Sequence, residues 1–100
     1  MYFCLEGRTV CIRDQEIDLT AKEFDALHLL IINRRRVLTF ETIAYHVWDE
    51  DYIDVTAQAI HNLMSRLRQK LQISPDVPEY VTSVRGVGYK FNSRKVNNKK

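Results

Sequence analysis

The stretch at residues 80–91 constrains the fold of this 100-residue chain more than any other part. It holds two runs rich in β-branched and aromatic residues, which are typical of strands. Between the runs lies Arg85, followed by Gly86 and then Gly88. Because glycine adopts the backbone angles of tight and bulged turns, the stretch predicts a β-hairpin with a cation at its tip. The alternative is that this arginine is only a solvent-exposed turn residue with no binding role, which would give the same sequence pattern.

Residues 57–71, just upstream of the hairpin, have the spacing of an amphipathic helix. At about 100° per residue its apolar side chains fall within a narrow arc, which predicts the buried face. This face consists of Ile60, Met64, Leu67 and Leu71. On the same wheel Gln58, Asn62, Ser65 and Gln69 point directly outward, Ala59, His61 and Arg66 lie on the flanks, and Arg68 lies on the His61 side.

A basic helix followed by a basic hairpin is the order of a winged helix, in which the helix enters one DNA groove and the hairpin reaches the adjacent groove. Gln and Asn can read adenine, Arg can read guanine, and flanking cations can hold phosphates. A long cation such as Arg85 suits the narrow, negative minor groove. An ordinary amphipathic helix with a solvent-exposed polar face would have the same pattern. The order of helix and hairpin nevertheless favours a DNA-binding function.

Three short β-prone runs, at residues 2–5, 9–12 and 16–19, predict an antiparallel meander at the N-terminus. Thr20 and Glu23 follow at the spacing of a capping box. The helix that they begin is expected to run to about residue 33, before three arginines that suit the negative end of a helix dipole. Its predicted inward residues are Phe24, Leu27, Leu30 and Ile31.

Residues 37–38 read as a short extended link, after which Thr39 can cap a second helix that ends near Trp48. Its predicted inward residues are Ile43, Ala44 and Val47. Residues 49–54 predict an acidic loop, and Asp54 or Thr56 caps the third helix. The fold class is therefore α+β: a winged helix-turn-helix with an N-terminal antiparallel sheet, three helices and a C-terminal β-hairpin wing. We expect this domain at residues 1–92 and a basic, disordered tail at residues 93–100.

The formal net charge of +2 conceals a segregation along the chain. Residues 1–55 carry 6 Lys/Arg and 11 Asp/Glu, a net −5, and residues 56–100 carry 9 and 2, a net +7. Four of the nine cations lie in the tail, yet the C-terminal part keeps +3 without them. This asymmetry favours a polyanion as partner for the C-terminal part.

Several function classes lack support in the sequence. There is no nucleophile motif, paired-carboxylate signature or phosphate-binding glycine loop, so an enzyme is not expected. His28, His46 and His61 have no metal-like spacing, and neither a metal nor a cofactor is expected. Cys4 and Cys11 are expected to be buried reduced thiols, with a cross-strand disulfide as the alternative. Without a secretory signal, or an apolar run near the roughly 20 residues of a membrane span, we expect a cytoplasmic protein with no membrane partner.

Four blocks of the chain resemble the C-terminal DNA-binding (effector) domain of OmpR/PhoB-type response regulators of bacterial two-component systems. The blocks are residues 19–24, 47–48, 65–71 and 81–91, and they cover nearly the whole domain in the right order. The resemblance implies sequence-specific DNA binding that controls transcription. It implies a recognition helix at residues 57–71 in the major groove and a wing in the minor groove.

The resemblance also implies roles for individual residues. Arg66 and its outward neighbours would face bases, Arg68 would face phosphate, and Arg85 would face the minor groove. Ser83 stands where the wing usually has threonine, and its hydroxyl can still reach a phosphate. The predicted DNA contacts are Gln58, Ala59, Asn62, Ser65, Arg66, Arg68 and Gln69 from the helix, and Trp48, Ser83, Arg85 and Tyr89 from the backbone-facing and wing positions.

In such domains the loop before the third helix can touch RNA polymerase. In this chain that loop contains Asp49, Glu50, Asp51, Tyr52 and Asp54. Phosphates would repel its carboxylates, so a protein partner fits it better than DNA. The alternative is a solvated loop whose acidic residues only assist helix capping.

The resemblance implies that two domains bind head to tail on direct repeats. It also implies a receiver domain and a cognate sensor kinase in the full-length protein. We expect this chain to be the effector domain of a soluble regulator, with a free-standing regulator as the alternative. The N-terminal sheet shows three β runs where the family usually has four strands. Gln58, Ala59 and Ser65 differ from the residues common at these positions in relatives, so the base preference of the helix stays open. The alternative function is a winged helix that binds an acidic protein and does not bind DNA specifically.

Overall fold

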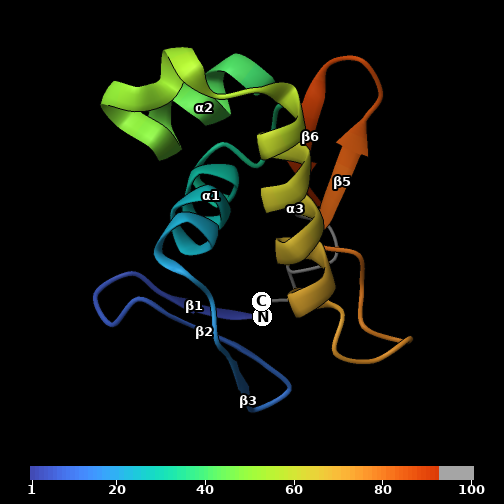
Figure 1. The fold of residues 1–100 in the computed structure, drawn as a ribbon. Helices are drawn as coiled ribbons and strands as arrows, with labels where there is room; N and C mark the ends of the chain where they lie inside the picture. The colour runs from blue at the N-terminus through green and yellow to red at the C-terminus, as the bar shows by residue number, and fades with distance from the viewer. Residues whose placement is uncertain (93–100) are drawn as a thin grey trace.

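The computed structural model describes residues 1–92, which fold as two small antiparallel sheets and three α-helices around one core (Figure 1). The predicted α+β class is confirmed, and the predicted tail at residues 93–100 lies outside the described residues. The elements are β1 (Tyr2–Cys4), β2 (Thr9–Ile12), β3 (Gln15–Ile17), α1 (Ala21–Ile32), β4 (Leu38–Thr39), α2 (Phe40–Trp48), the 3-10 helix η1 (Asp49–Asp54), α3 (Ala57–Leu71), β5 (Val81–Val84) and β6 (Gly88–Phe91).

The N-terminal sheet is the predicted meander, with outer strands slightly shorter than expected. Arg13 and Asp14 join β2 to β3, and both have positive φ (54° and 67°), as a two-residue type I′ turn requires. The register places Cys4 opposite Thr9 rather than opposite Cys11. Both cysteines are free and only half-buried, so the cross-strand disulfide is geometrically disfavoured and the thiols are more accessible than predicted.

The helix caps follow from the sequence. The Thr20 hydroxyl accepts the backbone N–H of Glu23 at 3.2 Å, and the Glu23 carboxylate accepts the N–H of Thr20 at 2.9 Å, so the predicted capping box is confirmed. Thr39 caps α2 as predicted. Of the two candidates for α3, Thr56 is the cap, because its hydroxyl accepts the N–H of Ala59.

The three helices turn their predicted apolar faces into one core. Leu63 is buried in addition to the four residues expected from α3, whereas Ile31 of α1 is only half-buried. Within residues 1–92, no helix has the length and apolar character needed to cross a membrane. The confirmed inward residues are Phe24, Leu27 and Leu30 of α1, Ile43, Ala44 and Val47 of α2, and Ile60, Met64, Leu67 and Leu71 of α3.

The predicted extended link before α2 is instead a strand. Leu38 and Thr39 form β4, which pairs antiparallel with β6 opposite Tyr89 and Gly88. The C-terminal hairpin therefore belongs to a three-stranded sheet of order β4–β6–β5. A two-residue strand has no periodicity that a sequence pattern could reveal, so the prediction of a two-stranded hairpin alone was incomplete.

Glycine is required at two positions of the hairpin for different structural reasons. Gly86 has φ of +76° at the turn, which confirms the predicted need for glycine geometry there. Gly88 has no positive φ, but a Cβ at this position would overlap the backbone carbonyl of Leu38. The close approach of β4 to β6 therefore excludes any side chain at Gly88.

The predicted acidic loop after α2 is a 3-10 helix, η1. It packs against α2, where the Tyr52 ring meets the Tyr45 ring edge-on at a centroid distance of 5.1 Å. This aromatic contact gives the acidic segment a defined shape that its composition alone did not predict.

Candidate nucleic-acid interface

Helix α3 presents an exposed polar row along its outer face. Gln58, Asn62, Ser65 and Gln69 are all exposed, which confirms their predicted outward orientation. The Gln58 side-chain amide donates to the Asn62 side-chain oxygen at 3.0 Å, so two members of the row are linked in the free protein. Ala59 and Arg68 are half-buried, whereas His61 and Arg66 are exposed.

One flank of α3 is held by a buried carboxylate, and we call it the α1 flank. The Glu23 side chain is only 1% exposed, accepts from Lys70 Nζ at 2.7 Å and lies 3.6 Å from Arg66 Nε. Burial alone would raise the pKa of Glu23, but the hydrogen bonds from Lys70 and Thr20 outweigh burial and lower it. The sequence identified Glu23 only as a capping residue, and nothing in its spacing indicated a contact with residues more than forty positions later.

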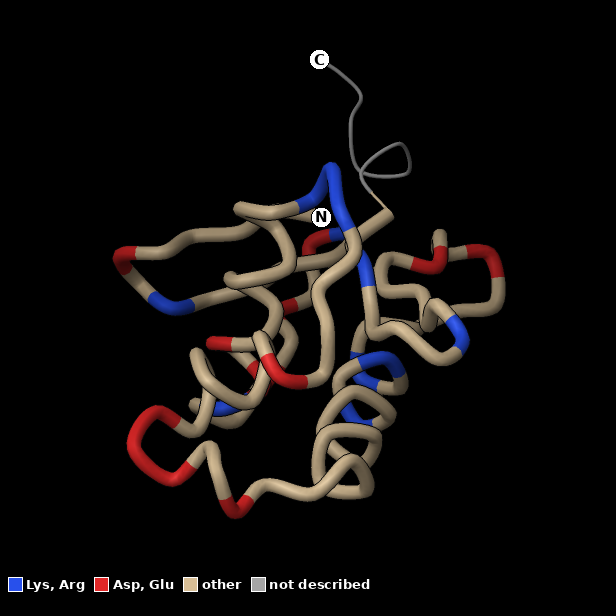
Figure 2. Tube along the Cα trace, turned by 90° about the horizontal axis from the view of Figure 1, so that it is seen from above, with Lys and Arg blue, Asp and Glu red and all other residues tan. Residues whose placement is uncertain are grey.

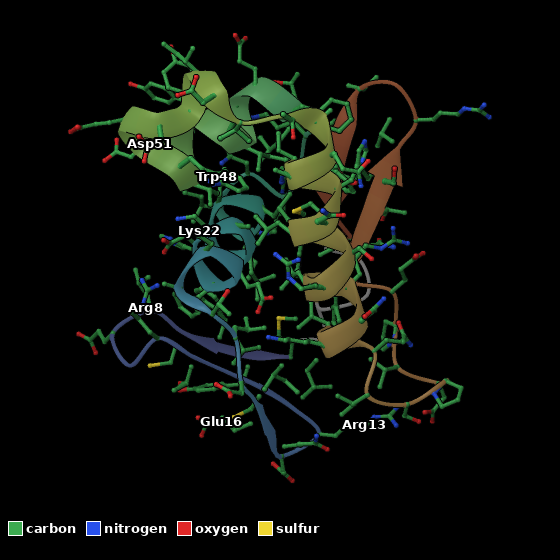
Figure 3. All side chains as sticks on the ribbon, viewed as in Figure 1. Arg8, Arg13, Glu16, Lys22, Trp48 and Asp51 are labelled. Atoms are coloured by element: carbon green, nitrogen blue, oxygen red, sulfur yellow. The ribbon has the colours of Figure 1, made fainter. Side chains whose placement is uncertain are left out.

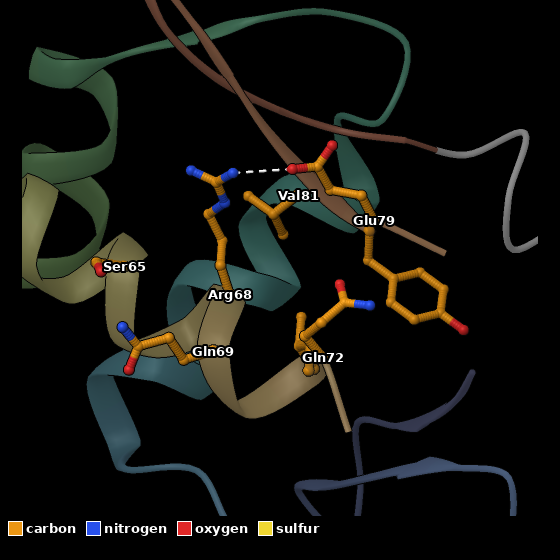
Figure 4. A pocket seen from close by; sticks show the side chains of 8 residues that line it. Ser65, Arg68, Gln69, Gln72, Glu79 and Val81 are labelled. Carbon is orange, nitrogen blue, oxygen red and sulfur yellow. Dashed lines mark hydrogen bonds and ion pairs between the residues drawn. The ribbon is translucent and has the colours of Figure 1, made fainter. Parts of the chain in front are cut away.

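The opposite flank faces the β5–β6 hairpin, and we call it the hairpin flank. Here Arg68 donates to the Glu79 carboxylate at 2.8 Å, with both side chains partly exposed (Figure 4). The pair borders a cavity of about 250 Å³ between α3 and the start of β5. The predicted phosphate ligand Arg68 therefore already has an anionic partner in the free protein.

The hairpin flank also holds His61 against β6. His61 Nδ1 and the Tyr89 hydroxyl are 2.6 Å apart, and the Phe40 ring meets the imidazole edge-on. Tyr89 is only 4% exposed, and burial raises its pKa, with a small opposing effect of the Arg68 charge. A direct DNA contact from Tyr89, as predicted, would require its hydroxyl to leave His61.

The hairpin tip exposes the predicted arginine. The N–H of Val87 donates to the carbonyl of Val84 at 3.0 Å and closes a turn that contains Arg85 and Gly86. Arg85 is exposed, and so is Ser83 on β5. Two predicted wing contacts are thus accessible on the hairpin next to α3.

The predicted backbone-facing residue Trp48 ends α2 and is half-buried against the core. Lys22 of α1 lies over its indole ring, with Nζ 5.7 Å from the centroid (Figure 3). This cation adds positive charge beside Trp48 that the sequence analysis did not associate with the site.

The acidic predicted contacts lie on η1, apart from the cationic turns of α3 (Figure 2). Asp49, Glu50, Asp51 and Asp54 are exposed, and Tyr52 is half-buried. Ile53 between them is 78% exposed, an apolar residue within an acidic surface that the sequence analysis did not single out.

The charge segregation along the sequence is kept only in part by the fold, because η1 remains a separate acidic surface but Glu23 does not. Glu23 comes from the acidic N-terminal part, yet it lies against the cations of α3. Arg66, Lys70 and Arg68 each have a carboxylate partner. Among described residues after position 55, Arg85 and Lys90 are the cations without one.

Comparison with known families identifies the domain. The family model described as "Transcriptional regulatory protein, C terminal" matches residues 14–91. The chain belongs to this family. It is an OmpR/PhoB-type winged-helix domain of response regulators, in which α3 takes the position called the recognition helix and the β5–β6 hairpin the position called the wing. The family is one of non-enzymatic transcriptional regulators, which confirms the prediction that the chain is not an enzyme.

Relatives of this winged-helix domain include full-length regulators and isolated domains. Sensory transduction protein RegX3 of Mycobacterium leprae is 38% identical over 90 residues, which cover 89% of this chain and 44% of RegX3. The DNA-binding domain of Bacillus subtilis CssR is 32% identical with a TM-score of 0.75, over 90% of this chain and 97% of that one. Response regulator DrrB of Thermotoga maritima, an OmpR/PhoB homologue, is 30% identical with a TM-score of 0.70, over 83% of this chain and 37% of DrrB. The chain thus spans less than half the length of RegX3 and of DrrB.

Proposed function

We propose that this winged-helix domain binds a specific duplex DNA sequence as the effector domain of a two-component response regulator. The observation that carries the proposal is the exposed amide and hydroxyl row of α3, which lies next to a wing with the exposed cation Arg85 at its tip. The description of the CssR relative as a DNA-binding domain supports the same function.

The recognition helix would lie in the major groove. Its outward residues Gln58, Asn62 and Gln69 offer amides suited to adenine, and Arg66 on the α1 flank is 59% exposed and long enough to reach a guanine. Ala59 and Ser65 would contribute an apolar contact and a hydroxyl to the same surface.

Backbone and minor-groove contacts would come from the surroundings of the helix. Arg68 would exchange Glu79 for a phosphate, and Trp48 with its neighbour Lys22 would lie near the backbone at the end of α2. On the wing, Ser83 would donate to a phosphate and Arg85 would enter the adjacent minor groove.

The acidic η1 helix would serve a protein partner, for which RNA polymerase is the candidate. Asp49, Glu50, Asp51 and Asp54 are exposed around Tyr52 and the exposed Ile53, which combines negative charge with apolar surface. Phosphate would repel such a surface, whereas a basic groove with an apolar floor on a protein would accept it.

In the full-length protein, a receiver domain phosphorylated by a sensor kinase would control this effector domain. The naming of the RegX3 relative as a sensory transduction protein supports this proposal. Two domains would bind head to tail on direct repeats spaced by about one helical turn of DNA.

The test is selection of bound sequences from a random duplex pool, followed by titration of the best site and of random DNA. We expect tighter binding to the selected site, with an affinity that falls steeply with salt. Replacing Arg85 by Ala should lower affinity most for sites with an A/T-rich flank, and Arg13→Ala, on the β2–β3 turn, is the matched control. If the selected site and random DNA bind equally at moderate salt, the proposal of specific binding is wrong, and the alternative of a winged helix that binds an acidic protein is favoured.

A further inference from the structure

His61 is an exposed recognition-helix residue whose side chain is held by two other elements. Its Nδ1 lies 2.6 Å from the Tyr89 hydroxyl of β6, and its ring packs edge-on against Phe40 of α2 at a centroid distance of 5.1 Å. Exposed side chains usually keep their rotamer freedom, so this arrangement fixes the direction of an imidazole that water would otherwise leave mobile.

The hydrogen bond determines which imidazole nitrogen is free. The Tyr89 hydroxyl has no other hydrogen-bond partner among residues 1–92, and Tyr89 is buried. If Nδ1 donated to this hydroxyl, the phenolic hydrogen would be buried without an acceptor, which is costly. Tyr89 therefore donates to Nδ1, and the neutral imidazole of His61 carries its hydrogen on Nε2.

The position of His61 in the fold indicates which part of a bound DNA duplex would lie next to its Nε2–H. Figure 1 shows the wing beside α3, and the pairs His61–Tyr89 and Arg68–Glu79 join the helix to the segment of residues 79–91. If α3 lies in the major groove and the wing in the adjacent minor groove, the DNA strand that separates these grooves must run between helix and wing. His61 lies at this junction.

Ser83 adds a second donor at the same junction. It is the cross-strand partner of Tyr89, so both side chains lie on the same face of the hairpin, and Ser83 is exposed. Tyr89 thus has two neighbours with hydrogen-bond donors, the His61 imidazole and the Ser83 hydroxyl, at the junction that one phosphodiester would pass.

We propose that His61 is a phosphate-contact residue that donates Nε2–H to the DNA strand between the two grooves, and that Tyr89 is the positioning residue that orients it. The proposal rests on the proposed DNA-binding function. It also changes the role of Tyr89, which acts through His61 instead of contacting DNA itself.

The experiment measures affinity for the selected site, together with phosphate ethylation interference on that duplex. Loss of one hydrogen bond to a phosphate in His61→Ala should weaken binding about five- to tenfold, by the same factor for all sequences. Ethylation of one phosphate should strongly weaken wild-type binding and should weaken His61→Ala by a clearly smaller factor, because only the Ser83 contact to that phosphate remains. His46→Ala, an exposed histidine of α2, is the matched control and should leave affinity and interference pattern unchanged.

Two further arms separate positioning from folding. Tyr89→Phe should lose less affinity than His61→Ala and should cause no additional loss in the His61→Ala background. A neutral methylphosphonate at the identified phosphate should weaken binding of the wild-type protein by a larger factor than binding of His61→Ala. Each factor compares two duplexes with one protein, so it does not depend on the stability of the variant. If wild type binds its site specifically but His61→Ala keeps the full interference pattern, the inference is wrong and the proposed function stands. If wild type shows no preferred site, the proposed function itself fails.

Discussion

The α1 flank and the hairpin flank of the recognition helix each hold an arginine against a glutamate, but the two glutamates differ in exposure. The Glu23 side chain is 1% exposed, and the Glu79 side chain is 52% exposed. Exposed ion pairs typically contribute about 0–1 kcal/mol, whereas a buried carboxylate that loses its partners is strongly destabilising. The contrast indicates that Glu23 fixes the position of α3, and that Glu79 is able to release Arg68 to a phosphate.

The hairpin flank depends on the close packing of β4 on β6, and the first prediction tests this dependence. Gly88→Ala should destabilise the domain by about 3 kcal/mol, because the new Cβ overlaps the Leu38 carbonyl and must separate the strands. Denaturant unfolding measures the loss. Gly86→Ala is the control, and its positive φ should cost about 1 kcal/mol. Equal losses for the two variants would show that β4 gives way easily and is not a rigid support for Tyr89.

The α1 flank should respond mainly in stability. Glu23→Ala removes half of the capping box and the partner of Lys70, and should cost about 2 kcal/mol in the free energy of unfolding. Glu23→Gln retains an acceptor for the Thr20 N–H and should lose less. A Glu23→Ala variant as stable as wild type would remove the proposed difference between the flanks.

The lowered pKa of Glu23 also predicts a dependence of stability on pH. Because its folded-state pKa lies below the ordinary glutamate value, the ionised carboxylate contributes stability above that value. This contribution is lost as the pH falls through the folded-state pKa. Unfolding titrations should therefore show wild type losing its advantage over Glu23→Gln in acid, and an advantage that does not vary with pH would contradict the assignment.

The sequence predicted the helices well because each has a local cause. The caps Thr20 and Thr39 and the apolar stripe of α3 act within a few residues, so spacing alone reveals them. Strand β4 was missed because it exists only through its pairing with β6, some fifty residues later in the chain.

The same division applies to the candidate site. The outward row of α3 follows from helical geometry, and the structure confirms its exposure. Helical geometry does not predict which residues contact the two flanks of α3. Glu23, Glu79 and Tyr89 come close to this helix only after the chain has folded. Charge counts along the sequence placed Glu23 with the acidic part, although it lies beneath the basic helix.

The two arginines of the recognition helix should affect DNA binding differently. Arg66→Ala should cost about 1–2 kcal/mol at the best site and relax the preference at one or two base positions. Arg68→Ala should weaken all sequences alike and flatten the salt dependence by about one unit of slope. Binding-site selection and salt titration on both variants measure these effects. The reverse pattern would mean that the α1 flank faces the backbone and the hairpin flank faces the bases.

The smallest expected effect is a gain, and it tests whether Glu79 competes with DNA. If a phosphate must displace Glu79 from Arg68, then Glu79→Gln removes the competitor and one negative charge near the DNA, and affinity should rise about two- to threefold. Asp76→Asn is a matched control, because Asp76 also precedes β5 and pairs with an arginine, but that arginine is Arg13 and not a residue of α3. Both variants remove the same charge, so a general electrostatic effect would raise affinity equally, whereas release of Arg68 raises it only for Glu79→Gln. The gain should shrink as salt rises, because ions screen the exposed pair. A loss of affinity in Glu79→Gln would show instead that Glu79 holds Arg68 in the orientation that DNA requires, so that both flanks would be fixed supports for the recognition helix.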